Sequence, residues 1–523
     1  MVGGLALALL VGGCTTVGPD FKRPEAPVAQ DWIERQDPKL KVGEEVDYGA
    51  WWKAFNDPVL DHLVEAAYGQ NLNLQIAGVR IMQARAQLGI AVGSQYPQLQ
   101  QASGDLNRNR ISKHSANLGP GVDRSFWNAA IGFDAGWELD FWGRFRRGVE
   151  SAQANLVANV ASYDNALVSL TAEVARTYVA IRTFEERIKI ARQNVAIQQR
   201  SLQIARVRFD NGAVTELDVT QATSLLRETQ ALIPQLEIGL RQSKNALAVL
   251  LGKPPAEIEA ILEAPGVIPV APAEVAVGIP AELLRRRPDV RAAELQAAAQ
   301  SALVGVAEAD LYPRFSLLGS IGLSAADTGN NDGGDLFKTS SLTYFVGPSF
   351  SWPILNYGRL KNNVRVQDAR LQELLISYQN TVLRAAQEVE DGLVGFLRSQ
   401  EQVKYLAGSV KASERSVQLA NIQYRDGAVD YQRVLDTQRA LVSVQDNWTR
   451  ARGDIALNLV ATYKALGGGW EQRIGKEVVD EAYLKQMTER IDWGELPPQK
   501  DLPEQLDPPP PARDQSLFGA PDW

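Results

Sequence analysis

The spacing of apolar residues along this chain alternates between two periods. From Trp127 to Phe141 every odd position is apolar, and the even positions are polar, charged or small. A period of two is typical of a strand with one apolar face. The same alternation predicts strands over 315–324 and 342–354. A fourth segment, Leu99 to Arg110, is nearly all polar and is predicted as a strand only because an internal repeat requires it.

The strands form two predicted hairpins, and beyond each hairpin the apolar positions recur in steps of four and three. This seam runs from Leu156 to Phe209 in the first half and from Leu371 to Tyr424 in the second. A heptad seam sustained that far predicts a long helix packed against neighbours, roughly 100 Å in length at about 1.5 Å per residue. Shorter helices are predicted over 72–95, 216–251 and 431–466.

Glycine marks the end of each long helix. The turns are predicted at Asn211-Gly212-Ala213 and at Asp426-Gly427-Ala428. Glycine is favoured just past a helix C-terminus because it adopts the left-handed conformation without strain. We therefore expect each half to be a rod with a hairpin of strands at one end and a tight helical turn at the other.

The sequence contains a long internal repeat of two copies. Trp137 and Trp352 are identical residues at a spacing of 215 (352 − 137 = 215), as are Gly212 and Gly427. Further upstream the spacing is 216, because Tyr96 recurs as Tyr312 (312 − 96 = 216). A repeat of this length predicts two equivalent halves packed by pseudo-symmetry.

The repeat and the proline-rich stretches divide the chain into six expected segments. These are a signal peptide (1–13), an extended segment (14–55), the first repeat (56–252), a Pro/Ala-rich linker (253–280), the second repeat (281–467) and a C-terminal segment with a Pro-rich tail (468–523).

Composition narrows the class of protein. The chain has 523 residues, of which 45% are hydrophobic and 22% charged, as in folded proteins. A net charge of −8 argues against a nucleic-acid partner. No apolar run reaches the roughly 18 residues of a membrane-spanning helix, so any part of the chain inside a bilayer must be embedded in another way, for which the strands are the candidates. Open strand edges are costly in lipid, and bacterial barrels start at eight strands, so several chains must contribute. Three copies leave a lumen, whereas two fill it with side chains.

The single cysteine, Cys14, excludes an internal disulfide. It follows the apolar run Leu5 to Val11 and Gly12-Gly13, although no Lys or Arg precedes that run. This arrangement resembles the lipobox of bacterial lipoproteins, which implies removal of residues 1–13, acylation of Cys14 with palmitate or similar chains, and sorting to the outer membrane because Thr15 follows. The alternative is an unpaired cysteine that ends an apolar leader. Each buried methylene of an acyl chain contributes about 0.8 kcal/mol to membrane binding.

Several motifs together resemble the outer-membrane efflux factors of the TolC and OprM type, in particular the NodT-like lipoprotein branch that serves resistance-nodulation-division (RND) pumps. They are Cys14, Pro19-Asp20-Phe21, Trp52 to Leu60, Glu138 to Arg144, Arg286 to Arg291, Pro353 to Arg359 and Ala465 to Trp470. The resemblance implies an α+β membrane protein, namely a homotrimer whose twelve-stranded β-barrel, with four strands per chain, continues into a periplasmic helical coiled-coil barrel. It also implies a periplasmic adaptor and an inner-membrane RND transporter as partners, outer-membrane lipid around the barrel, and export of drugs or other small molecules.

The resemblance also suggests site residues near the two glycine turns, where the family closes its channel and meets the adaptor. Tyr424 and Asp436 match residues of the family's mouth, and Arg433 stands where some members have a second aspartate. Three aspartates near one axis would favour cations and respond to pH. The alternatives are a packing role for Tyr424 and a solvated or capping role for Asp436.

An enzyme is not predicted. His62 and His114 are isolated, and no catalytic residues, metal-ligand spacing or cofactor motif is recognisable. Two other functions stay open. One is an outer-membrane conduit for type I protein secretion, which has the same architecture. The other is a non-conducting coiled-coil lipoprotein that spaces the envelope layers, which would not explain strands with one apolar face.

Overall fold

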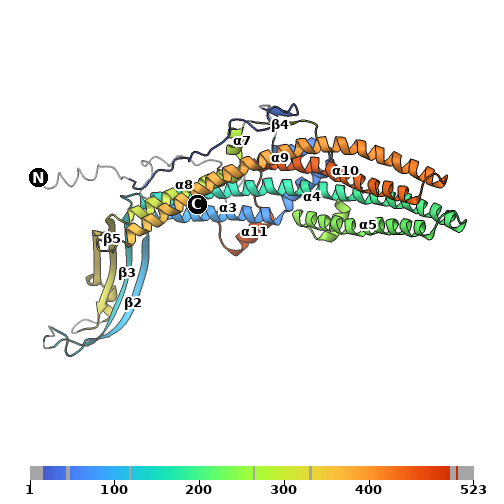
Figure 1. The fold of residues 1–523 in the computed structure, drawn as a ribbon. Coiled ribbons are helices and arrows are strands. Elements are labelled where there is room, and N and C mark those ends of the chain that lie inside the picture. Colours follow the sequence, from blue (N-terminus) through green and yellow to red (C-terminus); the bar gives the residue numbers. More distant parts are fainter. Residues whose placement is uncertain are drawn as a thin grey trace.

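The computed structural model describes residues 16–42, 48–116, 119, 121–262, 266–278, 280–328, 333–494 and 502–503. The molecule is a long bundle of helices with a curved sheet projecting from one end (Figure 1). The predicted signal peptide, Cys14 and nearly all of the Pro-rich tail lie outside the described residues.

Four antiparallel strands form the projecting sheet in the order β2-β3-β5-β6. They are β2 (Leu99–Arg110), β3 (Ser125–Leu139), β5 (Arg314–Ala326) and β6 (Leu342–Ser351). The polar strand β2 is therefore confirmed, and all of its residues are exposed. The two hairpins meet where β3 pairs with β5, for example Trp137 with Leu317.

One face of this sheet is apolar and exposed. Paired residues of antiparallel strands share a face, and the exposed apolar residues lie opposite one another, as Phe133 pairs with Ile321 and Ile321 with Tyr344. A contiguous apolar surface of this kind marks a membrane or protein contact. The sequence predicted this face correctly.

Two strands end earlier than their alternation predicted. Strand β3 stops at Leu139 because the carboxylate of Asp140 accepts hydrogen bonds from the backbone N–H groups of Phe145 (3.1 Å) and Arg146 (2.9 Å) and so caps the next helix. Strand β6 stops at Ser351, two residues before Pro353, which has no N–H to donate to a ladder.

The helices have the lengths that the apolar seams predicted. The long helices α4 (Arg144–Asp210) and α9 (Arg359–Arg425) each contain 67 residues. Helices α5 (Glu216–Leu250) and α10 (Tyr431–Ala465) each contain 35, and α3 (Leu72–Gly93) and α8 (Pro288–Ala309) each contain 22. Most seam positions of α4 are buried, including the two non-apolar ones, Thr177 and Gln198.

The shorter helices α3 and α5 stack end to end along α4. At the joint, Asn71 Nδ2 donates a hydrogen bond to the carbonyl oxygen of Leu250 (2.9 Å), and the Asn71 side chain also caps α3. Gly252 completes the joint with a φ of +64°, and a Cβ there would lie 2.3 Å from the carbonyl oxygen of Gln70. Glycine is required at this position because the space and the conformation both exclude a side chain.

A belt of short elements surrounds the middle of the rod, and most of it was not predicted. It contains η1 (Tyr48–Phe55), α2 (Pro58–Gln70), α6 (Ile258–Leu262), α7 (Pro280–Arg286), η5 (Trp470–Arg473) and α11 (Glu481–Arg490). Two three-residue strands, β1 (Leu40–Val42) and β4 (Val275–Val277), form a parallel ladder here. The segments expected to be an extended lead-in and a linker are thus joined by backbone hydrogen bonds.

The main core lies under this belt. Trp51 stacks on Tyr463 of α10 with ring centroids 5.3 Å apart. Beside it, Arg473 is buried and its Nε donates to Asp164 Oδ1 of α4 at 2.6 Å. The belt is therefore fixed to the helices by both apolar packing and a buried ion pair.

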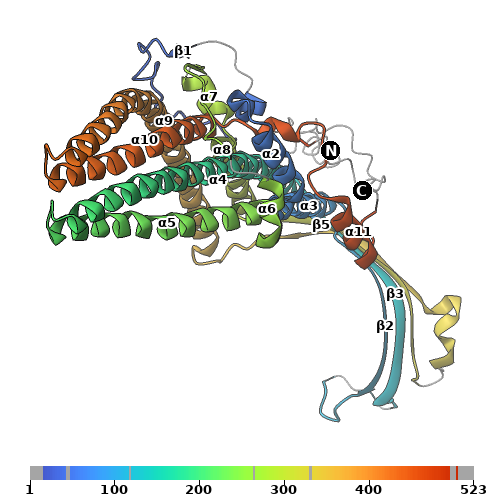
Figure 2. The ribbon, with the colours of Figure 1, turned by 90° about the vertical axis from the view of Figure 1, so that its right-hand side faces the viewer.

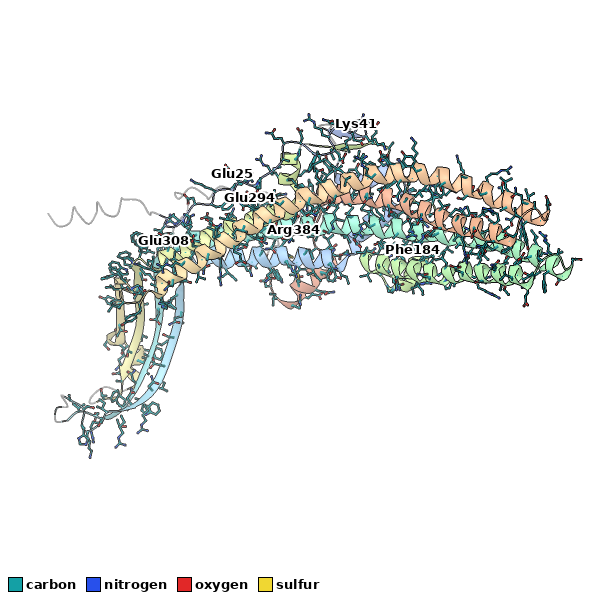
Figure 3. All side chains as sticks on the ribbon, viewed as in Figure 1. Glu25, Lys41, Phe184, Glu294, Glu308 and Arg384 are labelled. Carbon is teal, nitrogen blue, oxygen red and sulfur yellow. The ribbon has the colours of Figure 1, made fainter. Side chains whose placement is uncertain are left out.

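Residues 16–35, here called the N-terminal strap, run along the outside of the helices (Figure 3). The strap begins beside the sheet, where the Val17 N–H donates to the Trp142 carbonyl at 3.1 Å. Gly18 lies close to Gly305, because a Cβ added to Gly18 would be 2.3 Å from the Gly305 Cα atom. Further along, Arg23 pairs with Glu294 of α8 at 2.6 Å.

Candidate functional site at the helical tips

Two helical hairpins, α4–α5 and α9–α10, end together at the end of the rod remote from the sheet (Figure 2). In the first turn, the Ala213 N–H donates to the Arg208 carbonyl at 2.8 Å and the Gly212 N–H to the Phe209 carbonyl at 2.8 Å. Gly212 has a φ of +71°. This hydrogen-bond pattern satisfies the last carbonyls of α4 and reverses the chain within a few residues.

The second turn has the same geometry. The Ala428 N–H donates to the Gln423 carbonyl at 2.8 Å and the Gly427 N–H to the Tyr424 carbonyl at 3.0 Å, with Gly427 at a φ of +78°. The six residues predicted for the tips, which also include Asn211 and Asp426, all lie in these two turns and are exposed. Their role in contacting a partner stays a prediction.

Tyr424 fastens the second hairpin to the first. Its ring is buried in a tip cluster of apolar residues, and its hydroxyl donates to Asp218 Oδ2 of α5 at 2.9 Å. The Arg208 guanidinium of α4 lies 4.6 Å from the centre of the Tyr424 ring and donates to the Tyr424 carbonyl. One residue of α9 is thus held by both α4 and α5.

The hydroxyl of Tyr424 stays protonated at neutral pH. Burial, together with the hydrogen bond to Asp218, raises the pKa of Tyr424 above its ordinary value. Its neighbour Tyr431, in edge-to-face contact at 5.2 Å, has a pKa raised to about 12, chiefly by burial. Both groups therefore remain neutral, and Tyr424 acts as a donor to the Asp218 carboxylate.

Asp436 and Arg433 lie on the exposed surface of α10. Asp436 Oδ1 accepts a hydrogen bond from Gln432 Nε2 of the same helix at 2.9 Å. The backbone N–H of Arg433 donates to Asp430, which caps the helix. The structure therefore brings Tyr424 together with Asp218 and Arg208, while Asp436 and Arg433 face outward from the single chain.

Three polar residues of α4 are buried next to the tip cluster. They are Asn194, Gln198 and Ser201, which lie between Ala191 of a small apolar cluster and Leu202 of the tip cluster. Ser201 Oγ donates to Asn421 of α9 at 2.9 Å and accepts from Gln438 of α10 at 2.5 Å. Neither polar atom of the buried Gln198 side chain has a hydrogen-bond partner among the described residues.

We expect Gln198→Leu to stabilise the bundle by about 1–3 kcal/mol, because it removes a buried side chain whose polar atoms are unsatisfied. The expected readout is a higher midpoint of thermal unfolding. The matched control is Gln199→Leu at the adjacent exposed position. An equal rise in both variants would attribute the effect to helix propensity rather than to burial.

Comparison with known proteins identifies the family. The family model described as outer membrane efflux protein matches residues 63–253 and again residues 279–468. This chain belongs to the outer membrane efflux protein family. The two matches coincide with the two sets of equal-length helices and with the strands between them.

Relatives and solved structures within the family agree. The chain is 33% identical to nodulation protein T of Rhizobium leguminosarum bv. viciae, over 89% of this chain and 92% of that protein. It is 32% identical to the outer membrane protein OprJ of Pseudomonas aeruginosa, over 90% and 96% of the two chains. The solved outer-membrane channel OprN superposes with a TM-score of 0.79 at 34% identity, covering 87% of this chain and 99% of that one.

The sequence interpretation of this efflux-family protein missed Asp218 and Arg208. The internal repeat, however, distinguishes both Tyr424, the donor, and Asp218, its acceptor, from their counterparts in the other half. The counterpart of Asp218 is Arg433 (433 − 218 = 215), so the charge reverses between halves. The counterpart of Tyr424 is Phe209 (424 − 209 = 215), so the hydroxyl occurs in one half only. Residues that differ between the two repeats at matched positions therefore indicate where the α4–α5 and α9–α10 hairpins make different contacts.

Proposed function

We propose that three copies of the chain form the outer-membrane channel of a tripartite efflux system. In this arrangement drugs or other small molecules pass from an inner-membrane RND transporter and a periplasmic adaptor through a helical tunnel and a β-barrel to the outside. Family membership supports efflux across the outer membrane.

The observation that carries the proposal is the exposed apolar face of a four-stranded sheet with two edge strands, β2 and β6. Unpaired backbone groups are costly in lipid, so the edges must be paired by other copies. Four strands from each of three copies make a twelve-stranded barrel, within the range of bacterial outer-membrane barrels and wide enough for a lumen. The polar face of the sheet, with Asp134 and Ser320 as a pair, would line it.

The helical tips supply the gate in this proposal. The bond from Tyr424 to Asp218 holds the α9–α10 hairpin against α4 and α5. Asp436 and Arg433 lie on the exposed side of α10, where three copies would bring them toward a common axis. Carboxylates and guanidinium groups at such a constriction select ions by charge. The turns at Gly212 and Gly427 would contact the adaptor.

Lipid attachment at Cys14 fits the start of the N-terminal strap. Thr16 contacts Gly143 at the junction between β3 and α4, because a Cβ on Gly143 would lie 2.6 Å from the Thr16 side chain. Two residues span at most about 7 Å, so an acyl chain on Cys14 would start close to the base of the barrel. The proposal also keeps the division of the chain into the six segments expected from the repeat and the proline-rich stretches.

Conductance of the purified protein in planar bilayers tests the proposal. We expect a trimer that resists dissociation in detergent unless heated, and a pore in the wild type or in Asp436→Ala. The pore should conduct small ions, whereas a conduit for unfolded proteins would also need to pass polypeptides. A verified trimer that stays silent in both forms would leave the envelope spacer as the better explanation.

A further inference from the structure

The apolar face of the projecting sheet carries a pair of positive charges at one end. Alternation places every second residue of a strand on one face, and paired residues of antiparallel strands share that face. Arg108 pairs with Trp127 of β3, and Arg110 pairs with Ser125. Because Trp127 belongs to the apolar set of β3, both arginines of β2 lie on the apolar face.

The other residues of this face are uncharged. The register, followed from β2 through β3 and β5 to β6, gives Arg108 and Arg110 as the only charged residues that the four described strands place there. The acidic residues of these strands, Asp105, Asp134 and Glu138, all lie on the opposite face. The two arginines are therefore not part of a generally polar surface.

Both guanidinium groups are open to a partner. Arg108 lies over the ring of Trp127, 5.6 Å from its centre, and Trp127 is itself 43% exposed. Neither Arg108 nor Arg110 forms an ion pair with another described residue. Tryptophan is enriched where a membrane meets water, so the contact with Arg108 places a cation at that level.

The position of the pair along the strand matches the surface of a bilayer. Phe133 lies midway between Trp127 and Leu139, the ends of the apolar run of β3 (133 − 127 = 6 and 139 − 133 = 6). Six residues of a strand span about 20 Å, and a tilt of about 40° leaves roughly 16 Å along the membrane normal. Half of the hydrocarbon layer is about 15 Å thick. With Phe133 at the centre of the bilayer, Arg108 thus lies at the edge of the hydrocarbon and Arg110 lies among the headgroups.

The charged end of the sheet is the end remote from the helices. Strand β3 ends at Leu139, just before α4, so Trp127 lies toward the free end of the projecting sheet (Figure 1). Next to the helices the same face carries Trp137 paired with Leu317 and Leu139 paired with Phe315, without any charge. The two surfaces of a bilayer around this sheet would therefore meet different chemistry.

We propose that Arg108 and Arg110 bind the phosphate groups of a lipid in the leaflet remote from the helices, while the acyl chains of that lipid lie on the apolar face beside them. A guanidinium group matches phosphate in charge and donates parallel hydrogen bonds to it. The occupant is a phosphorylated lipid rather than free phosphate, because the arginines continue directly into the apolar face. This inference rests on the proposed channel and adds the class of lipid that its barrel selects.

Lipid binding by the purified full-length protein in detergent tests the site. The probes are fluorescently labelled lipid A, a phosphorylated glycolipid, and the same lipid after removal of its phosphates. We expect the wild type to bind the phosphorylated form at least about tenfold more tightly, because charge-assisted hydrogen bonds form only with that lipid. Arg108→Gln combined with Arg110→Gln should abolish this preference, and inorganic phosphate at the same concentration as the lipid should not displace it.

A matched control removes the same charge elsewhere. Arg200 and Arg206 are exposed on α4, outside the sheet, so Arg200→Gln combined with Arg206→Gln changes the net charge by the same amount. This variant should keep the preference for the phosphorylated lipid. An equal loss in both double variants would attribute binding to net charge and overturn the proposed site.

The state of the protein separates the remaining failures. A conducting trimer without a preference for the phosphorylated lipid overturns the lipid site and leaves the channel function standing. If Arg108→Gln with Arg110→Gln lowers the temperature of trimer dissociation in lipid-free detergent, the arginines serve a contact between copies, and the lipid site is again overturned. A protein that forms neither trimer nor pore overturns the channel and the lipid site together.

Discussion

Tyr424→Phe is expected to open the channel. The substitution keeps the ring in the tip cluster but removes the hydroxyl that donates to Asp218. A hydrogen bond to a charged group contributes about 1.5–3 kcal/mol, so its loss shifts the open-to-closed ratio by roughly one to two orders of magnitude per subunit. The measurement is single-channel conductance in planar bilayers, where the open state should occupy far more of the recording.

Two further variants give this prediction its controls. Asp218→Asn should act in the same direction, because a neutral amide is a weaker acceptor than the carboxylate. Tyr431→Phe removes a hydroxyl from the same cluster while leaving the Tyr424 bond in place and should change conductance little. Unchanged conductance in both Tyr424→Phe and Asp218→Asn, with the trimer intact, would contradict a gating role for this bond.

Asp164→Asn on α4 is expected to cause a large loss of stability, because Asp164 holds Arg473 of the belt. Both side chains of the Asp164–Arg473 pair are buried, with hydrogen bonds of 2.6 and 3.3 Å between them. Removing one charge of a buried pair costs about 3–5 kcal/mol, because the remaining charge is left without its counter-ion away from water. The measurement is the midpoint of thermal unfolding in detergent.

The control for this prediction is an exposed ion pair. Arg192 and Glu237 pair at 2.9 Å between α4 and α5 at the surface. Glu237→Gln should cost less than about 1 kcal/mol, because solvent screens such pairs. A small effect of Asp164→Asn, similar to that of Glu237→Gln, would show that the buried pair does not hold the belt to α4.

Most of this fold could be predicted from the sequence, because its apolar residues keep one period over long segments. The seam from Leu156 to Phe209 contains many apolar positions that all follow one helical period. The existence and the length of helix α4 were therefore predicted correctly. The polar strand β2 has no such pattern, and only its place in the repeat identified it. Repeats transfer information from a segment with a clear pattern to one without it.

The belt and the strap could not be predicted in the same way. Strands β1 and β4 are each three residues long, and the residues that pair are 235 positions apart in the sequence (275 − 40 = 235). Strands this short have no alternation of apolar and polar residues from which they could be predicted. The strap holds its place through single contacts such as Val17 with Trp142 and Gly18 with Gly305. Such contacts depend on the surface that the helices create after they pack.

The candidate gate was predicted in part. Tyr424 was selected by resemblance, and the structure places it at the tips in contact with the other hairpin. Its partner Asp218 lies in the first turn of α5, where an acidic residue also has an ordinary role in stabilising a helix N-terminus. The contact of Asp218 with Tyr424 could therefore not be predicted, because its place at a helix N-terminus already explained the acidic residue.

The position of the N-terminal strap has a consequence for assembly. An acylated Cys14 would tether each newly made chain to the membrane surface three residues before Val17, whose N–H donates to the Trp142 carbonyl. Confinement to a surface raises the effective concentration of the tethered strands relative to one another. Three chains would then find each other by a two-dimensional search before any strand enters lipid, which lowers the demand on expression level.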